Sequence, residues 1–577
     1  MPAIDLRRML SSSRPADCVS ERALPPARRG AAVPAWVEPA IAAFLLTILN
    51  ALKPLHVDDV IWWYFAKHLV EQPLAPFDFT IYWSQIATPA MDVMAPPVLP
   101  YWWAGAIRAL GEEPWLWKLS LLPINLLLAF SIRSLAMRFA PEVHRPLLWL
   151  ILLSPLVLPA ENLMLDVPCQ AFMLGGLALA LRGAENRRLT PAALGAVLIG
   201  MATLTKWNGL TGIAVLAWAM LLFAPSRRWL WIIAVPIAMF VGWEVALASS
   251  AGESHFLHHL ASEGRLRLER QVDLARPLLL LLAAAAPGLP VLALARGRHS
   301  RALAIGCAAI YLLMLFLLAA IPERPDGAAA LVESALTLLL AGVFSAALLR
   351  VAAIEWSSVK QTRHGEVGRR RPLLFFVGWL SIEVAGYFAF SPFPAARRVI
   401  GLFITLAFAL SFMIARAPEA RRCAWIAAAV SVLFGFVYEI ADTSAALTAK
   451  TEAHDARLWV DTHRTGGTVW FSGVHGFEYY ATQEGMRPAV PGQVTLNRGD
   501  WLIISGDPTV PLSRQLLYTL DESRVRLALR RDYPHALPVK TYPSYYIGRR
   551  PLQHATGPIT TLWLYRVVAP FRPTFKD

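Results

Sequence analysis

Long apolar runs separated by short polar links occupy the first three-quarters of the chain. A helix of about 20 apolar residues crosses the hydrocarbon core of a bilayer, and runs close to that length recur between Ala35 and Ile440. The pattern predicts about thirteen transmembrane helices, at 36–53, 119–137, 147–164, 167–181, 191–206, 209–224, 229–249, 277–295, 302–321, 329–349, 372–391, 399–416 and 423–441.

The polar links predict how these helices are oriented. Six arginines precede the first span, and the later basic links recur on one side of the membrane, at 138–145, 182–188, 227–228, 296–301, 350–371 and 416–422. Basic loops stay on the cytoplasmic side. We therefore expect a multi-pass protein of the inner (plasma) membrane, with a cytoplasmic tail at 1–35 and an extracytoplasmic C-terminus.

One apolar stretch does not fit this alternation. Residues 96–110 (PPVLPYWWAGAIRAL) are short and proline-rich, and counting them as a span would invert every later loop. We interpret them as a helix in the outer interface, where Tyr101, Trp102 and Trp103 are favourably placed. Residues 54–118 then form one long outer loop with interfacial helices, and long loops of this kind are usually functional.

The pattern changes after residue 441. Short β-like runs at 468–471, 501–505 and 561–568 are separated by Gly, Pro and Asp. We expect a small soluble α/β domain at 442–577, following a transmembrane domain at 36–441. The predicted fold class is a mainly α, polytopic membrane protein with this C-terminal domain.

Composition supports a membrane protein and excludes several other classes. The chain is 56% hydrophobic with a mean hydropathy of +0.47, too apolar for an ordinary soluble protein. Its net charge of +14 comes from basic residues scattered over loops, so no nucleic-acid partner is expected. Of the four cysteines, one lies in the tail and three in apolar segments, and no disulfide framework is expected.

Three acidic residues are candidate catalytic groups on the outer face. Asp58 and Asp59 follow the first span, and Asp166 follows the span at 147–164. One carboxylate can accept a proton from a nucleophile while another orients it, holds a metal or anchors the loop. Capping of the helices that begin near Val60 and Val167 is the alternative explanation, and both remain open.

Three cations on that face oppose the charge rule. Lys206 ends a predicted span there, and Arg397 and Arg398 begin one. A membrane-embedded anion such as a lipid phosphate would explain them. Snorkelling of these side chains to the headgroups is the alternative.

The outer loop at 251–276 carries three histidines, His255, His258 and His259, among several arginines. Their spacing is poor for a zinc site. A basic surface helix is expected there instead.

These motifs, in their order, resemble the GT-C superfamily of polyprenyl-phosphate-dependent glycosyltransferases, especially its aminoarabinose-transferase and protein O-mannosyltransferase-like branch. They are DD-x4-Y at 58–64, PP-x3-YWW at 96–103, LD-x-P at 165–168, LTK at 204–206 and RR at 397–398, with FSGVHGFEYYATQEG and LNRGDWLIIS in the C-terminal segment. The resemblance covers nearly the whole chain.

The resemblance implies an inverting enzyme that transfers a sugar from a polyprenyl-phosphate donor to a lipid, glycan or protein acceptor at the outer face. By its motifs, Asp58 is the base or acceptor-orienting acid, Asp59 the acid that often follows it, and Asp166 the acid of the second loop. Tyr64 is expected to bind substrate. A requirement for a divalent metal ion is left open.

By the same motifs, Lys206, Arg397 and Arg398 lie near the donor phosphate. The chain departs from the family at one place: members often carry an acidic residue, a basic residue or a histidine before the PP pair, where this chain has Met94 and Ala95, with Asp92 nearby but not aligned. This departure bears on phosphate handling or on the choice of acceptor.

Two functions of other classes are alternatives. A lipid or sugar transporter or flippase would more often show paired repeats, which this sequence lacks. A non-catalytic assembly protein would use the C-terminal domain as a binding module.

Overall fold

The computed structural model of the chain describes residues 34–83, 86–262, 268–295, 300–321, 327–361, 367–463, 466–506, 520–537, 539–540, 553–555 and 557–574. Residues 1–38 and 39–577 form two separate units, and the second is described below. The predicted cytoplasmic tail at 1–35 falls almost entirely outside the described residues.

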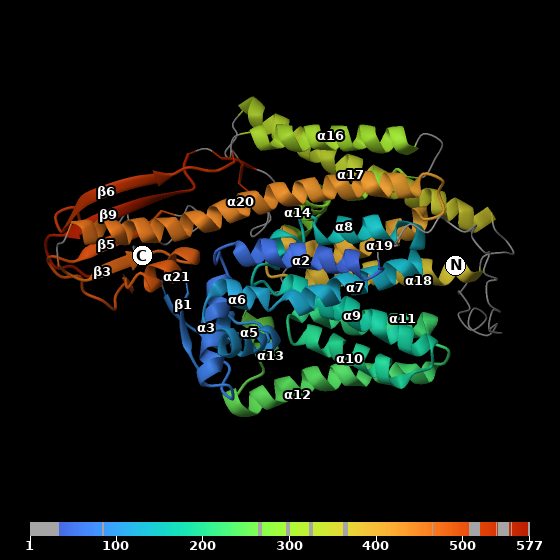
Figure 1. Cartoon of the computed structure of the whole chain (residues 1–577), viewed down its shortest axis with the longest axis horizontal. Helices are drawn as coiled ribbons and strands as arrows, with labels where there is room; N and C mark the ends of the chain where they lie inside the picture. The colour runs from blue at the N-terminus through green and yellow to red at the C-terminus, as the bar shows by residue number, and fades with distance from the viewer. Residues whose placement is uncertain are drawn as a thin grey trace. The chain divides into compact units, whose positions relative to one another are not determined.

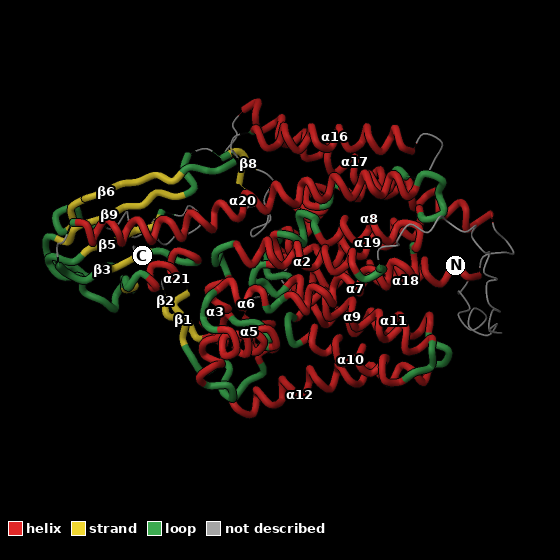
Figure 2. Tube along the Cα trace, in the orientation of Figure 1, coloured by secondary structure: helices red, strands yellow, loops and turns green. Residues whose placement is uncertain are grey.

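Helices dominate the second unit (Figures 1 and 2). They are α2 (Val37–Leu52, which begins in the first unit), α3 (Asp59–Glu71), α4 (Ala90–Val93), α5 (Val98–Leu110), α6 (Pro114–Leu119), α7 (Leu122–Phe139), α8 (His144–Leu152), α9 (Asp166–Glu185), α10 (Leu189–Thr203), α11 (Leu210–Phe223), α12 (Ala234–Ala251), α13 (His255–Ser262), α14 (Leu268–Ala285), α15 (Gly288–Ala293), α16 (Ser300–Ala320), α17 (Gly327–Gln361), α18 (Val367–Phe390), α19 (Ile400–Ile414), α20 (Ala420–Thr462) and α21 (Gly476–Gln483). Short 3-10 turns include η2 (Pro159–Glu161), η3 (Trp207–Gly209), η4 (Arg227–Ile233) and η5 (Ala396–Val399).

The apolar runs do form helices. Within the described residues, eight helices are long and apolar enough to cross a membrane, and three shorter apolar helices lie at Val37–Leu52, Leu189–Thr203 and Trp207–Phe223. This establishes several candidate crossings, whereas the count of about thirteen stays a prediction.

Two predicted spans are broken by proline. In the run at 147–164, α8 ends at Leu152, and irregular backbone with Pro155 and Pro159 continues to α9. In the run at 277–295, α14 ends at Ala285 and α15 begins at Gly288, with Pro287 between them. Proline lacks a backbone N–H and clashes with the preceding turn, so an apolar run that contains it need not be one helix.

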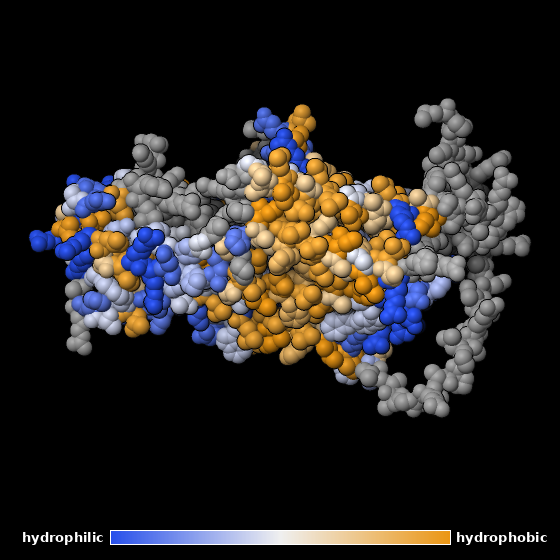
Figure 3. Space-filling view, turned by 90° about the horizontal axis from the view of Figure 1, so that it is seen from above, coloured by the Kyte–Doolittle hydropathy of each residue, from blue (hydrophilic) through white to orange (hydrophobic). Residues whose placement is uncertain are grey.

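Apolar side chains cover much of the helical surface. Figure 3 shows them as a broad band with hydrophilic residues on either side. On α16 and α17 the exposed members include Leu313, Phe316, Leu331 and Leu338. A water-soluble protein rarely exposes an apolar surface of this extent, and a lipid bilayer is the solvent that fits it.

The long first loop is structured. It holds α3, α4, α5, α6 and a hairpin of β1 (Thr80–Trp83) and β2 (Ile86–Pro89). The stretch predicted as an interfacial helix forms α5, whose 13 residues rise about 20 Å, less than a bilayer core. It packs on α3, with the Trp62 and Trp103 ring centroids 6.5 Å apart.

The three predicted β-runs form strands of one sheet. Its order is β4 (Arg487–Pro488), β3 (Val469–Ser472), β5 (Trp501–Ser505), β9 (Thr560–Val567) and β6 (Val525–Tyr533). β3 pairs in parallel with β4 and β5, and β9 is antiparallel to β5 and β6. A second pair is β7 (Val539–Lys540) with β8 (Gln553–His554). This confirms a small C-terminal sheet region.

Helix α20 joins the sheet to the apolar helices without a break. Its 43 residues run through the predicted boundary at 441–442, and its far end packs Ala453, Ala456 and Val460 against the sheet. Near its middle, Lys53 at the end of α2 places its Nζ 3.2 Å from Glu439 Oε2 and 3.0 Å from Asp442 Oδ2. Buried charges are stable only when paired in this way.

Candidate active site

A cavity of about 310 Å³ lies where several helix ends meet. Five of the seven predicted site residues line it: Asp58, Asp166, Lys206, Arg397 and Arg398. Asp58 precedes α3, Asp166 is the first residue of α9, Lys206 follows α10, and the two arginines lie in η5 before α19. Residues that are up to 340 positions apart in the sequence thus share one cavity.

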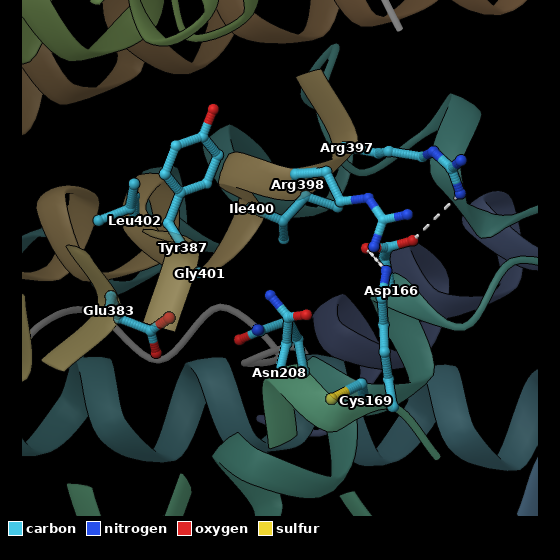
Figure 4. A pocket seen from close by; sticks show the side chains of 12 residues that line it. Asp166, Cys169, Asn208, Glu383, Tyr387, Arg397, Arg398, Ile400, Gly401 and Leu402 are labelled. Atoms are coloured by element: carbon cyan, nitrogen blue, oxygen red, sulfur yellow. Dashed lines mark hydrogen bonds and ion pairs between the residues drawn. The ribbon is translucent and has the colours of Figure 1, made fainter. Parts of the chain in front are cut away.

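The charged side chains contact one another directly. Arg397 Nη2 lies 3.2 Å from Asp58 Oδ2, and its Nη1 lies 3.7 Å from Asp166 Oδ2. Lys206 Nζ forms an ion pair with Asp166 Oδ1. Figure 4 shows Asp166 between these partners, with Arg398 pointing toward it, at one side of a smaller adjoining pocket. Arg397 therefore bridges the two acids.

Charge in the cavity favours an anion. Among the described lining residues, three cations face two carboxylates, which leaves one net positive charge when Lys206 is protonated and the histidines are neutral. The rest of the lining is mostly apolar and aromatic, with Ile61, Trp62, Phe390 and Phe393. In such surroundings charge interactions are stronger than in water.

The contacts decide between the alternative explanations of these residues. Asp58 stands at the N-cap position of α3, yet within the described chain its side chain makes no capping hydrogen bond. Asp166 opens α9 and binds Lys206 and Arg397. The Arg397 residue is 6% exposed, so it does not snorkel to solvent. Capping and snorkelling therefore do not explain these three side chains.

Asp59 lies away from the cavity lining and is fully buried. Its Oδ2 accepts the His56 N–H at 2.9 Å and its Oδ1 accepts the Leu163 N–H at 3.1 Å. Burial raises the pKa of this carboxyl, opposed by Lys118, whose Nζ lies 3.3 Å away. Asp59 thus joins the turn that carries Asp58 to the segment that leads into Asp166.

Lys118 strengthens the same junction. Its Nζ donates to the Lys53 carbonyl at 2.9 Å and to Asn162 Oδ1 at 2.6 Å. Both acid-bearing segments are therefore held by one buried group of polar side chains. The sequence left three roles open for the second acid of the pair: orienting the nucleophile, holding a metal or anchoring the loop. The contacts of Asp59 match the anchoring role.

Tyr64 also lies away from the cavity lining. Its hydroxyl donates to Glu478 Oε1 at 3.1 Å, which connects α3 to α21 of the C-terminal region. Burial raises the pKa of Glu478 to about 8, and the Tyr64 hydrogen bond opposes the rise. Burial also raises the pKa of Tyr64.

This buried carboxyl predicts a pH dependence of stability. Because the folded pKa of Glu478 exceeds its ordinary value near 4.5, the folded state binds the proton more tightly. The stabilisation is complete below about pH 4.5 and is lost as pH rises toward 8. Between pH 5 and 8, the thermal midpoint of the wild type should fall more than that of Glu478→Gln. Exposed Glu522→Gln is the control, and parallel curves for wild type and Glu478→Gln would contradict the assignment.

Four further polar or aromatic residues line the cavity: Trp207, Asn208, His259 and His475. Our sequence reasoning gave none of them a role in the site. Trp207 and Asn208 directly follow Lys206 in the sequence, so their place in the site could have been predicted from that adjacency. His475 comes from the C-terminal region, which no spacing rule connects to Asp58.

The prediction of a basic surface helix at 251–276 was wrong for two of its three histidines. In α13, His255 and His259 are 0% and 3% exposed. Their Nε2 atoms lie 3.0 Å from the Met94 carbonyl oxygen and 2.9 Å from the Met91 carbonyl oxygen. These buried rings hold the segment that places Met94 and Ala95 in the cavity lining, because buried backbone carbonyls need hydrogen-bond partners.

The arrangement does not fit a divalent metal ion. Within the described residues, no group of three or more His, Cys, Asp or Glu could hold one. The two carboxylates of the cavity already contact Arg397 and Lys206.

No protein-family model matches the chain, and no curated protein matches it significantly. Among solved structures it is similar to the oligosaccharyltransferase of Archaeoglobus fulgidus in the apo form, with a TM-score of 0.44 and 13% identity over 86% of this chain and 69% of that one. Complexes of the Archaeoglobus enzyme give lower values at 13% identity. With an inhibitory peptide and a dolichol-phosphate the TM-score is 0.30, covering 78% of this chain and 56% of that one. With zinc and sulfate it is 0.29, covering 78% and 61%.

Proposed function

We propose that this chain is a membrane glycosyltransferase that moves a sugar from a polyprenyl-phosphate donor to an acceptor O–H or N–H group. One observation carries the proposal. Two carboxylates and three cations, from four separate chain segments, line a single cavity among the ends of apolar helices. This combination of groups suits a lipid phosphate next to an acceptor that must lose a proton.

The cations supply the phosphate site. A guanidinium donates paired hydrogen bonds to phosphate oxygens, and an ammonium acts as a compact point charge. Lys206 and Arg398 lie beside Asp166, and the cavity also has apolar and aromatic walls formed by Trp62 and Phe393. The headgroup would bind to the cations, and the sugar or the first part of the lipid would pack on the aromatic rings.

Asp58 is the better base of the two cavity acids. Its side chain is 21% exposed, compared with 8% for Asp166. Asp166 contacts both Lys206 and Arg397, whereas Arg397 is the cationic contact of Asp58. We assign proton acceptance to Asp58 and assign to Asp166 the positioning of the two cations.

The transfer then balances as a single displacement. The acceptor oxygen or nitrogen attacks the anomeric carbon and forms the new bond while Asp58 takes its proton. The bond from that carbon to the phosphate oxygen breaks, and the electron pair leaves with the polyprenyl phosphate. Lys206 and Arg398 stabilise the charge that develops on that oxygen. Attack opposite the leaving group inverts the configuration.

Activity is tested with purified protein in nanodiscs, a panel of radiolabelled polyprenyl-phosphate sugars, and lipid, oligosaccharide and peptide acceptors. We expect transfer of label to one acceptor class. Movement of the intact donor across the bilayer without bond cleavage would favour a flippase instead. Neither transfer nor movement would favour an assembly protein.

The proposal requires the cavity to open on the extracytoplasmic side of the inner membrane. A reporter that is active only outside the cytoplasm should work when fused after Asp577 and fail when inserted between α17 and α18, after Gln361 and before Val367. Basic links stay inside, so the charge pattern sets this expectation. The reverse result would overturn the orientation, and equal activity at both sites would overturn the arrangement of spans.

A further inference from the structure

One residue of the C-terminal region reaches the cavity. His475 lines it together with Val57 and Asp58, although more than 400 positions separate them in the sequence. It is only partly buried and lies in the turn between β3 and α21. The mechanism proposed above assigns it nothing.

The backbone at His475 is strained. Its φ is 60° and its ψ is −140°, a region that glycine occupies readily and residues with a side chain rarely enter. A histidine is kept there only if the surrounding structure holds it. Strained backbone of this kind concentrates at functional sites.

Contacts around the start of α21 hold the residue in place. A Cβ on the next residue, Gly476, would lie 2.4 Å from the Leu55 carbonyl oxygen, so only glycine permits this approach. The Leu55 N–H donates to Tyr480 Oη at 2.9 Å, and the Tyr64 hydroxyl donates to Glu478, two residues earlier in α21. The start of α21 is therefore fixed against the turn that carries Asp58.

This docking places His475 on the Asp58 side of the cavity. Its neighbour Gly476 touches Leu55, three residues before Asp58, whereas Lys206 and Arg398 cluster around Asp166. The cationic side suits the donor phosphate, and the remaining side is next to the base. A group bound there must present its O–H or N–H to Asp58.

We propose that His475 binds the acceptor, so that the C-terminal region completes the active site. An imidazole has one nitrogen that accepts and one that donates a hydrogen bond, and it can therefore orient a polar acceptor beside Asp58. This inference rests on the glycosyltransferase function proposed above.

Two substitutions distinguish the effect of the imidazole ring from the effect of the strained backbone. His475→Ala removes the imidazole and keeps the Cβ that strains the backbone. His475→Gly removes both. If the residue serves the acceptor, both variants should raise the KM for the best wild-type acceptor of the panel by about tenfold or more, the effect of losing one positioned hydrogen bond. The affinity for radiolabelled polyprenyl phosphate alone should stay within about twofold.

The glycine variant also controls for folding. Because glycine relieves the strain, His475→Gly should have a higher thermal midpoint than His475→Ala while showing the same loss toward the acceptor. An unchanged acceptor KM in an active His475→Ala enzyme would overturn the inference, and so would an equal loss of polyprenyl phosphate affinity. A wild-type protein that transfers no sugar would instead show that the proposed function is wrong, and the inference would fall with it.

Discussion

Asp58→Asn should lower turnover by roughly 10²–10⁴-fold, the usual contribution of a general acid–base group. Asparagine keeps the size of the side chain and can still accept a hydrogen bond from Arg397, but it cannot take a proton at neutral pH. Donor affinity should change much less, because the cations near Asp166 remain. Initial transfer rates at saturating donor and acceptor measure the effect.

The adjacent residue is the matched control. Asp59→Asn removes a charge from the same turn, but Asp59 bonds to backbone N–H groups of His56 and Leu163 and to Lys118. It should lower the thermal midpoint and disturb turnover only through misplacement of Asp58. Turnover of Asp58→Asn within about threefold of wild type would reject its role as base. Equal losses of turnover in Asp58→Asn and Asp59→Asn, with unchanged thermal midpoints, would show that Asp58 and Asp59 do not have the separate roles of base and anchor.

Arg397→Gln should be the second severe change. Arg397 is 6% exposed and bridges Asp58 and Asp166, so its removal leaves two carboxylates close together without their shared cation. Breaking a buried ion pair by removing one partner typically costs about 3–5 kcal/mol of stability. We expect a large fall in the thermal midpoint and loss of transfer, measured on protein that still inserts in the membrane.

Two comparisons make this result interpretable. Arg421→Gln removes an exposed arginine at the start of α20 and should leave stability and transfer near wild type. Arg397→Lys keeps the charge but has no planar fork to reach both acids, so it should recover only part of the stability. If Arg397→Gln matches Arg421→Gln in both measurements, the bridging role is wrong.

Helices were predictable from the sequence because an apolar run long enough to cross a membrane has few other stable forms. The end of a helix depends on single residues, and Pro155 and Pro287 broke runs that a hydropathy pattern treats as continuous. Strand β5 was predicted to the residue, since WLIIS is a short apolar run between turn residues.

The grouping of residues in the candidate site was predictable in part. Cations and acids at helix ends on one predicted face marked Asp58, Asp166, Lys206, Arg397 and Arg398 as a group, and all five line the cavity. The sequence could not show which of Asp58 and Asp59 lines the cavity. Side chains of adjacent residues at the start of a helix point in different directions, and tertiary contacts decide which one is buried. The place of His475 in the cavity could not be predicted from the sequence, because it depends on how α21 docks on Leu55.

The unbroken course of α20 limits how the protein can be divided. A fragment that begins at residue 442 would start in the middle of a helix and would keep Asp442 while losing its buried partner Lys53. Such a fragment should fold poorly, and one that starts at Ala420 retains the whole helix but still lacks Lys53 as the partner of Glu439 and Asp442. Limited proteolysis should likewise spare residues 420–462, because a packed helix about 65 Å long offers a protease no extended linker. Because α20 is one continuous helix, it joins the sheet to the apolar helices without a loop at which the two could hinge.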